Sequence, residues 1–253
     1  MSFDTLRKSS SRQFLTGRLV RPTELHHDQV ASMYAVMVRH FEGIEWETFL
    51  RDLSEKDWVL LLESEDGLQG FSTIAVYPAE VRRQRITVVY SGDTIVARDA
   101  WGSSALCRLW IDSVLSLRDH DPARPCYWLL LCSGYRTYRF LPTFFKTFVP
   151  RHDRSTPPTQ QSMLEELASA RFGTQFVADS GIVRFSRAPQ RLRPELAAIP
   201  PGRMAHPDVT FFLAKNPGHV DGDELVCLTE ISIDNLTPAG LRMAAPVSQP
   251  AVR

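Results

Sequence analysis

The chain has 253 residues and a formal net charge of zero, since 29 basic side chains balance 29 acidic ones. A neutral chain has no overall positive field, so we expect no nucleic-acid partner. The length is sufficient for one well-packed domain with an elaborated terminus.

The cysteines and histidines do not have the pattern of a metal site. The four cysteines form no Cys-x-x-Cys pair, and the seven histidines have no ligand spacing with cysteine or a carboxylate. We therefore expect no metal, and reduced thiols in a cytoplasmic protein. The first residues contain no apolar run long enough for a signal peptide or a membrane span, so no membrane segment is expected.

The N-terminal part of the chain predicts a tail, a strand and two helices. Residues 1–16 are expected to form a flexible tail, and a short strand is predicted near 17–22. From Thr23, an apolar stripe with helical spacing predicts a helix that ends near Gly43. A second helix is predicted over 46–53, because its large apolar residues share one face.

Three strands are predicted next, because runs rich in β-branched and aromatic residues alternate with turn residues. The runs cover 58–63, 68–77 and 86–96, with a hairpin turn at Asp66-Gly67 and a loop over 78–83.

The third of these strands leads through a polar turn into an amphipathic helix over 106–117. The turn contains Gly102, Ser103 and Ser104. Unpaired N–H groups at the positive end of a helix dipole form a site for an anion, above all a phosphate. The joint therefore predicts a phosphorylated carrier, and the alternative is an ordinary loop with no ligand.

A continuous apolar run over 126–132 predicts a strand that is buried on both faces. A helical segment with a break at Pro142 is predicted over 135–148, and a further helix over 160–172. The rest of the chain is predicted to contain a segment that crosses the surface over 190–207, short strands over 211–213 and 225–228, and a flexible tail over 244–253.

The order of elements and the run from Val96 to Leu106 resemble the GNAT acyltransferase superfamily, whose pyrophosphate loop has a pattern like V-x-P-x-Y-R-G-x-G-I-G. Gly102 keeps the first loop glycine, Ser104 stands at the second, and Trp101 replaces the Arg or Gln. The resemblance covers residues 17–150. It implies an α/β (α+β) fold with a mixed, mostly antiparallel central sheet flanked by helices, and it leaves residues 151–243 as a C-terminal extension packed on this core.

The resemblance also implies the substrates. The donor would be an acyl-CoA, or a phosphopantetheine-linked acyl group on an acyl carrier protein, and the acceptor an amine on a small molecule or peptide. The sequence leaves open whether the chain forms a homodimer. The residues that the resemblance assigns to the donor are Val96, Trp101, Gly102, Ser103, Ser104 and Ala105.

Asp93 is the first candidate for proton handling. Glycine inside a strand pattern marks irregular backbone, so Ser91-Gly92 is the predicted site of the bulge that GNAT enzymes carry in this strand. Asp93 is the only carboxylate of the strand and would accept the amine proton or anchor the ammonium. The alternative is that it bonds backbone groups of the bulge. Tyr90 lies near the position where many members hold a catalytic Glu.

The resemblance assigns the protonation of the leaving thiolate to a tyrosine after the 126–132 strand. Tyr138 is the first choice and Tyr135 its companion; both have the alternative of packing at the edge of the core. His40 could assist proton transfer, or interact with the dipole of its own helix.

The expected function is therefore an N-acyltransferase that works by direct attack of an amine on a thioester, without an acyl-enzyme. The rival is a non-catalytic relative that binds a ligand or partner. A third alternative is a hydrolase with Cys132 as its nucleophile.

Overall fold

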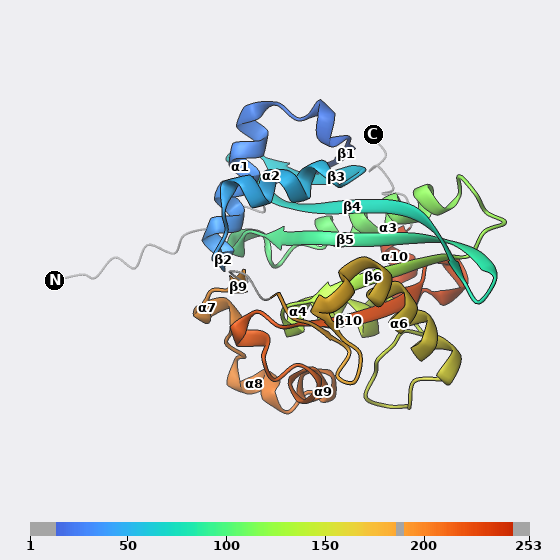
Figure 1. The fold of residues 1–253 in the computed structure, drawn as a ribbon. Helices are drawn as coiled ribbons and strands as arrows, with labels where there is room; N and C mark the ends of the chain where they lie inside the picture. The colour runs from blue at the N-terminus through green and yellow to red at the C-terminus, as the bar shows by residue number, and fades with distance from the viewer. Residues whose placement is uncertain (1–13, 186–189, 245–253) are drawn as a thin grey trace, which may run out of the picture.

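The computed structural model describes residues 14–185 and 190–244, so most of the predicted tails, 1–13 and 245–253, lie outside the described residues. The described chain forms an eight-stranded sheet in the order β1-β3-β4-β5-β6-β10-β8-β7 (Figure 1). Its strands are Thr16–Val20 (β1), Trp58–Ser64 (β3), Gly67–Val81 (β4), Gln84–Val96 (β5), Cys126–Cys132 (β6), Phe176–Val177 (β7), Ile182–Val183 (β8) and Glu224–Glu230 (β10).

The pairing in this sheet confirms the predicted fold class. Every pair of neighbours is antiparallel except β5 and β6, which run parallel. A separate two-stranded sheet joins Phe41–Glu42 (β2) to Arg191–Leu192 (β9). Residues 151–243 contribute β7, β8 and β10 to the main sheet, so the C-terminal part of the chain continues the sheet instead of lying only on its surface.

Helices cover both faces of the sheet (Figure 1). On one face lie α3 (Ala105–Arg118) and α10 (Pro238–Ala244), and on the other lie α1 (His27–His40), α2 (Trp46–Ser54) and α6 (Pro158–Phe172). Strands β3, β6 and β10 have nearly continuous buried runs because both of their faces are covered. The shorter helices are α4 (Tyr135–Tyr138), α5 (Phe140–Phe144), α7 (Pro194–Ala197), α8 (Pro201–Met204) and α9 (Pro207–Lys215).

The predicted loop over 78–83 is wrong. β4 continues to Val81, and only Arg82 and Arg83 turn the chain into β5. Both have positive φ angles, 53° and 66°, as the two central residues of a type I′ hairpin turn require. The usual Asn-Gly signal is absent, so the sequence pattern did not reveal the tight turn.

Two predictions for the C-terminal half also fail. Residues 211–213 lie in α9 and not in a strand, because Pro207 begins a helix whose Val209 and Phe212 are buried on one face. The segment over 135–148 forms two short helices that meet at Arg139, and Pro142 lies inside the second one. After α5 the chain is extended and forms isolated bridges from Phe145 to Leu236 and from Val149 to Leu228.

Candidate functional site

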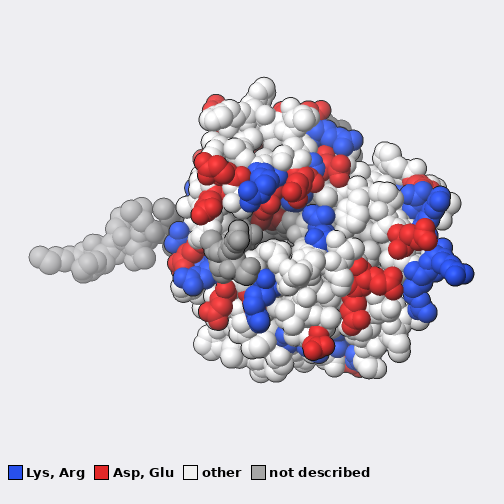
Figure 2. All heavy atoms as spheres, in the orientation of Figure 1, with Lys and Arg blue, Asp and Glu red and all other residues white. Residues whose placement is uncertain are grey.

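A cavity of about 820 Å³ lies where β5 and β6 separate. Figure 2 shows the opening of this cavity near the centre of the visible face of the molecule, with acidic and basic side chains gathered along one edge of the opening. Its walls come from α1, α2, β5, α3, α4 and the end of α6, so residues far apart in the sequence meet there.

The separation of the strands follows from their register. β5 pairs with β6 only from Thr87 to Ser91, opposite Cys126 to Leu130. Between β4 and β5 the register shifts, since Ser72 pairs with Thr94 but Ile74 pairs with Ser91. Gly92 and Asp93 therefore stand opposite the single residue Thr73 as a β-bulge, which confirms the bulge predicted at Ser91-Gly92.

Asp93 lies on this bulge and lines the cavity. Burial raises the pKa of the Asp93 carboxyl to about 6, and the Asp52 carboxylate adds to this rise. The Lys56 ammonium and a hydrogen bond from Gln190 oppose it, because both favour the charged form. A carboxylate with this pKa is ionised at neutral pH and is able to accept a proton from an ammonium.

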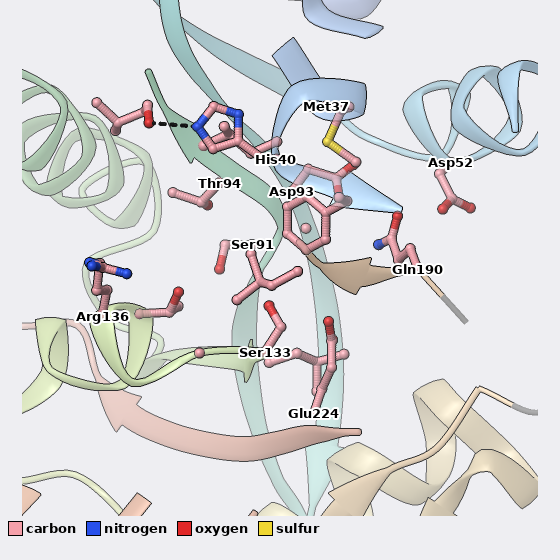
Figure 3. A pocket seen from close by; sticks show the side chains of 18 of the residues that line it. Met37, His40, Asp52, Ser91, Asp93, Thr94, Ser133, Arg136, Gln190 and Glu224 are labelled. Carbon is pink, nitrogen blue, oxygen red and sulfur yellow. Dashed lines mark hydrogen bonds between the residues drawn. The ribbon is translucent and has the colours of Figure 1, made fainter. Parts of the chain in front are cut away.

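Glu224, the first residue of β10, is a second buried carboxyl in the same cavity. Burial and the nearby Asp93 raise the pKa of Glu224 to about 8, and a hydrogen bond from Ser133 opposes the rise. Figure 3 shows Glu224 entering from the side of β10, with Ser133 beside it, and Asp93 beside Gln190. We did not predict Glu224 because the Asp221-to-Glu224 stretch reads as a turn. The available signal was a carboxylate directly before an apolar strand.

Tyr90 lines the same end of the cavity, and the Arg171 guanidinium lies over its ring at 3.9 Å from the centroid. Burial and then the charge of Glu224 raise the pKa of Tyr90, so its hydroxyl stays protonated at neutral pH. The structure thus brings Tyr90 and Asp93 together, as expected, and adds Lys56, Arg171 and Glu224 to them.

His40 also lines the cavity, at the end of α1. Its ring is held by two backbone carbonyls, with Nδ1 at 2.8 Å from the Val36 oxygen and Nε2 at 3.1 Å from the Val96 oxygen. Both ring nitrogens therefore face carbonyl acceptors, to only one of which a neutral imidazole can donate, and this position favours a structural link between α1 and the end of β5 over proton transfer.

Tyr138 is not among the residues that line the cavity. It is fully buried, its hydroxyl donates a hydrogen bond to the Pro150 carbonyl at 3.1 Å, and it packs against Phe148 and Phe212. Tyr135 lines the cavity instead, because α4 begins at that residue, directly after the end of β6. Of the two predicted tyrosines, the structure brings only Tyr135 to the site.

The predicted donor loop lies at another part of the cavity. Val96, Trp101 and Ser103 line it, whereas Gly102, Ser104 and Ala105 are not among its lining residues. The Trp101 indole donates a hydrogen bond to the Val96 carbonyl at 2.7 Å, and the Ser103 hydroxyl accepts one from the Ala105 N–H at 3.0 Å.

Two arginines accompany Trp101. The guanidinium carbon of Arg136 lies 4.4 Å, and that of Arg98 5.5 Å, from the centroid of the indole ring. Arg136 also donates to the Leu196 carbonyl at 3.0 Å, which ties α4 to α7. These two cations stand next to the position where GNAT enzymes hold an Arg or Gln.

Aromatic side chains form the wall between these two parts of the cavity. Trp110 of α3 and Trp128 of β6 lie with their ring centroids 4.0 Å apart and their planes tilted by 37°, and Phe140 contacts both rings in an edge-to-face arrangement. The Trp128 indole donates to the Ser91 hydroxyl at 2.8 Å, where β5 and β6 part. The wall is therefore mainly apolar, and the Trp128 indole is fixed by its hydrogen bond to Ser91.

The described residues contain no group of three or more His, Cys, Asp or Glu placed to hold a metal ion. Within the same described ranges, no helix combines the length and apolar character that a bilayer span requires. Cys132 is fully buried beside Cys227, at 3.8 Å between their sulfur atoms, and burial raises its pKa, so its surroundings do not favour a nucleophilic thiolate.

No protein-family model matches the chain, and the curated proteins give no match. Among solved structures, the chain is similar to a probable N-acyltransferase from Enterococcus faecalis, with 14% identity, a TM-score of 0.40, and coverage of 55% of this chain but only 37% of that one. A GNAT family N-acetyltransferase from Escherichia coli in complex with CoA has 19% identity and a TM-score of 0.38, over 52% of this chain and 69% of that one. NAA60 from Arabidopsis thaliana, in complex with a bisubstrate analogue, has 17% identity and a TM-score of 0.39, over 53% and 86%.

Proposed function

We propose that the chain is an N-acyltransferase that moves an acyl group from an acyl-CoA, or from a carrier-linked phosphopantetheine thioester, to an amine. The observation that carries this proposal is the position of Asp93. It lies on a bulge at the point where two parallel strands part, in a cavity that also reaches the first turn of α3.

The parted strands offer a place for the donor. Beyond Ser91, β5 no longer pairs with β6, so the edge of β5 that faces the cavity has backbone groups available for the amides of a pantetheine arm. The aromatic wall of Trp110 and Trp128 would flank that arm. The phosphates would lie at the N-terminus of α3, where Arg98 and Arg136 supply the positive charge that Trp101 lacks.

The chemistry needs one base and one proton for the thiolate. Asp93 takes a proton from the acceptor ammonium, and the free amine attacks the thioester carbonyl carbon. The C–N bond forms and the C–S bond breaks, while the second proton of the nitrogen passes to the departing thiolate, which leaves as a thiol. Tyr135 is the proposed relay for this proton, since it lines the cavity at the start of α4.

Substitution of Gly102 tests the donor site. A Cβ at Gly102 would meet no atom within 4 Å, so Gly102→Val should fold normally while its side chain blocks the approach of a phosphate to the backbone. We expect at least about a tenfold loss of CoA affinity by titration calorimetry, which corresponds to about 1.4 kcal/mol, with an unchanged melting temperature.

Gly202→Val is the matched control, because Gly202 is also an exposed glycine with nothing within 4 Å of a Cβ, and it lies in α8 outside the cavity lining. If Gly102→Val and Gly202→Val bind CoA and acyl carrier protein equally well, the donor site is misplaced. A wild-type chain that binds the donor but transfers no acyl group to any amine would favour the non-catalytic rival.

A further inference from the structure

The Asp93 end of the cavity contains charges of both signs. The carboxylates Asp52 and Glu55, at the end of α2, line the cavity beside Lys56. Two cations, Lys56 and Arg171, and two buried carboxyls, Asp93 and Glu224, also line this end. They come from the α2–β3 turn, the end of α6, the β5 bulge and the start of β10. The groups lie close enough to influence each other: Lys56 and Asp93 each favour the charged form of the other, and Arg171 disfavours the charged form of Lys56.

These four groups do not neutralise one another by direct contact. The ion pairs within 4.0 Å among the described residues all lie elsewhere. Lys56 donates to the Asp52 carbonyl at 2.8 Å, which leaves two of its three N–H donors for a ligand. Arg171 lies on the Tyr90 ring, and its buried Nε has no hydrogen-bond acceptor among the described residues.

Separated and partly buried charges are costly without partners. A ligand with only an amine would give the Asp93 carboxylate a partner and leave Lys56 and Arg171 without one, and a ligand with only an acid group would do the reverse. A small ligand that carries both an ammonium and a carboxylate offers a partner to each kind of group: its ammonium to the Asp93 carboxylate and the Glu224 carboxyl oxygen, and its carboxylate to Lys56 and Arg171. Its amine would lie at the base that the reaction requires.

From this arrangement we infer that the acceptor is a free amino acid, whose ammonium lies at Asp93 and Glu224 and whose carboxylate lies at Lys56 and Arg171. The inference rests on the proposed function for the identity of the reacting amine. It assigns Arg171 and Lys56 to acceptor recognition and not to the donor, whose phosphates would lie near Arg136 at the other part of the cavity (Figure 3).

Binding of acceptor analogues tests the inference without a choice of acyl group. Each of the twenty standard amino acids is titrated into the wild-type protein at up to about 10 mM, with and without CoA. Every amino acid that binds is then compared with its carboxamide and with the corresponding amine that lacks the carboxyl group. We expect at least one amino acid to bind, and to bind at least about tenfold more tightly than both analogues, because a charge-assisted hydrogen bond contributes about that factor.

Arg171→Gln and Lys56→Met should each reduce the preference for the acid over the carboxamide towards unity and leave CoA affinity unchanged. Arg171→Lys should retain part of the preference, and Arg154→Gln, an exposed arginine paired with Asp153 outside the cavity lining, should retain all of it. The ratio of the affinity for the acid to the affinity for the carboxamide does not change when part of the protein is unfolded. Because two independent variants are measured, the test still stands if one of them does not fold.

The inference is wrong if no amino acid binds, or if carboxamides and simple amines bind as well as the acids. CoA binding separates this result from failure of the proposed function: a protein that binds CoA and acylates simple amines keeps the proposed function and loses only the amino acid as acceptor.

Discussion

Asp93 and Glu224 show how position in a fold changes the chemistry of one functional group. Both are carboxyls in the same cavity, and burial is the main cause of the raised pKa of each. Asp93 has Lys56 beside it, so its pKa reaches only about 6, whereas Glu224 has Asp93 as a charged neighbour and its pKa reaches about 8. At neutral pH the first is mostly a base and the second mostly a neutral acid.

The pH dependence of acyl transfer should report Asp93. Because its carboxyl must be ionised to accept a proton, we expect the single-turnover rate to rise with pH through about 6. Asp93→Asn should lower that rate by about 10²–10⁴-fold and remove this limb of the profile. Stopped-flow detection of the released thiol measures both. Full activity in a folded Asp93→Asn protein, across the pH range, would reduce Asp93 to a residue that supports the bulge.

The stability of the protein should report Glu224. Its pKa in the folded chain lies above the ordinary glutamate value of 4.5, so the folded state binds more protons and its stability falls as pH rises from about 4.5 to about 8. Glu224→Gln removes this loss. We therefore expect the variant to gain stability relative to wild type mostly above pH 8, and least below pH 4.5, in urea unfolding at several pH values. A difference that is independent of pH would show that Glu224 is not the group that titrates.

At the scale of elements, helix α4 decides which tyrosine meets the cavity. The sequence pattern predicts a helical segment over 135–148 with a break at Pro142, in which Tyr135 and Tyr138 would be neighbours on one face. Helix α4 instead ends at Tyr138, and the hydrogen bond from the Tyr138 hydroxyl to the Pro150 carbonyl fixes that side chain in the core. The hairpin at Arg82 and Arg83 is a similar case, since its backbone conformation is set by the pairing of two long strands and not by its own residues.

The two tyrosines should therefore differ when each loses its hydroxyl group. Tyr135→Phe should lower the single-turnover rate, because the proposed proton relay is lost, and should leave stability nearly unchanged. Tyr138→Phe should keep the rate and lose about 1 kcal/mol of unfolding free energy, since the Pro150 carbonyl is left without its donor. Rapid-quench kinetics and urea unfolding on both variants separate these effects. The reverse pattern would restore Tyr138 as the acid.

At the scale of the whole molecule, the core and the site differ in how far the sequence predicts them. Strands β3, β5 and β6 and helices α1, α2, α3 and α6 follow from apolar periodicity, which burial enforces. The site depends on Glu224, Arg171 and Lys56, and these charged residues have no periodicity that marks them. They meet Asp93 only through the pairing of β10 with β6 and the packing of α6, which a linear pattern does not contain.

Removal of the C-terminal part tests whether residues 17–150 form a core of their own. A chain that ends at residue 157 lacks α6 and β10, so β6 becomes an edge strand with both of its faces apolar. We expect this chain to be insoluble, or to unfold without a cooperative transition, by soluble yield and thermal circular dichroism. Cooperative unfolding together with CoA binding would show that the predicted division at residue 150 is a true domain boundary.

The pairing of β10 with β6, which joins Leu225 to Cys132, has a consequence for the order of events during synthesis. Asp93 leaves the ribosome long before Glu224, and a strand pair of such sequence separation closes late. At about 5–20 residues per second, the ribosome needs several seconds to add the rest of the chain. During that interval the edge of β6 that pairs with β10 has no partner, so the growing chain remains exposed to aggregation through this edge until β10 has been made.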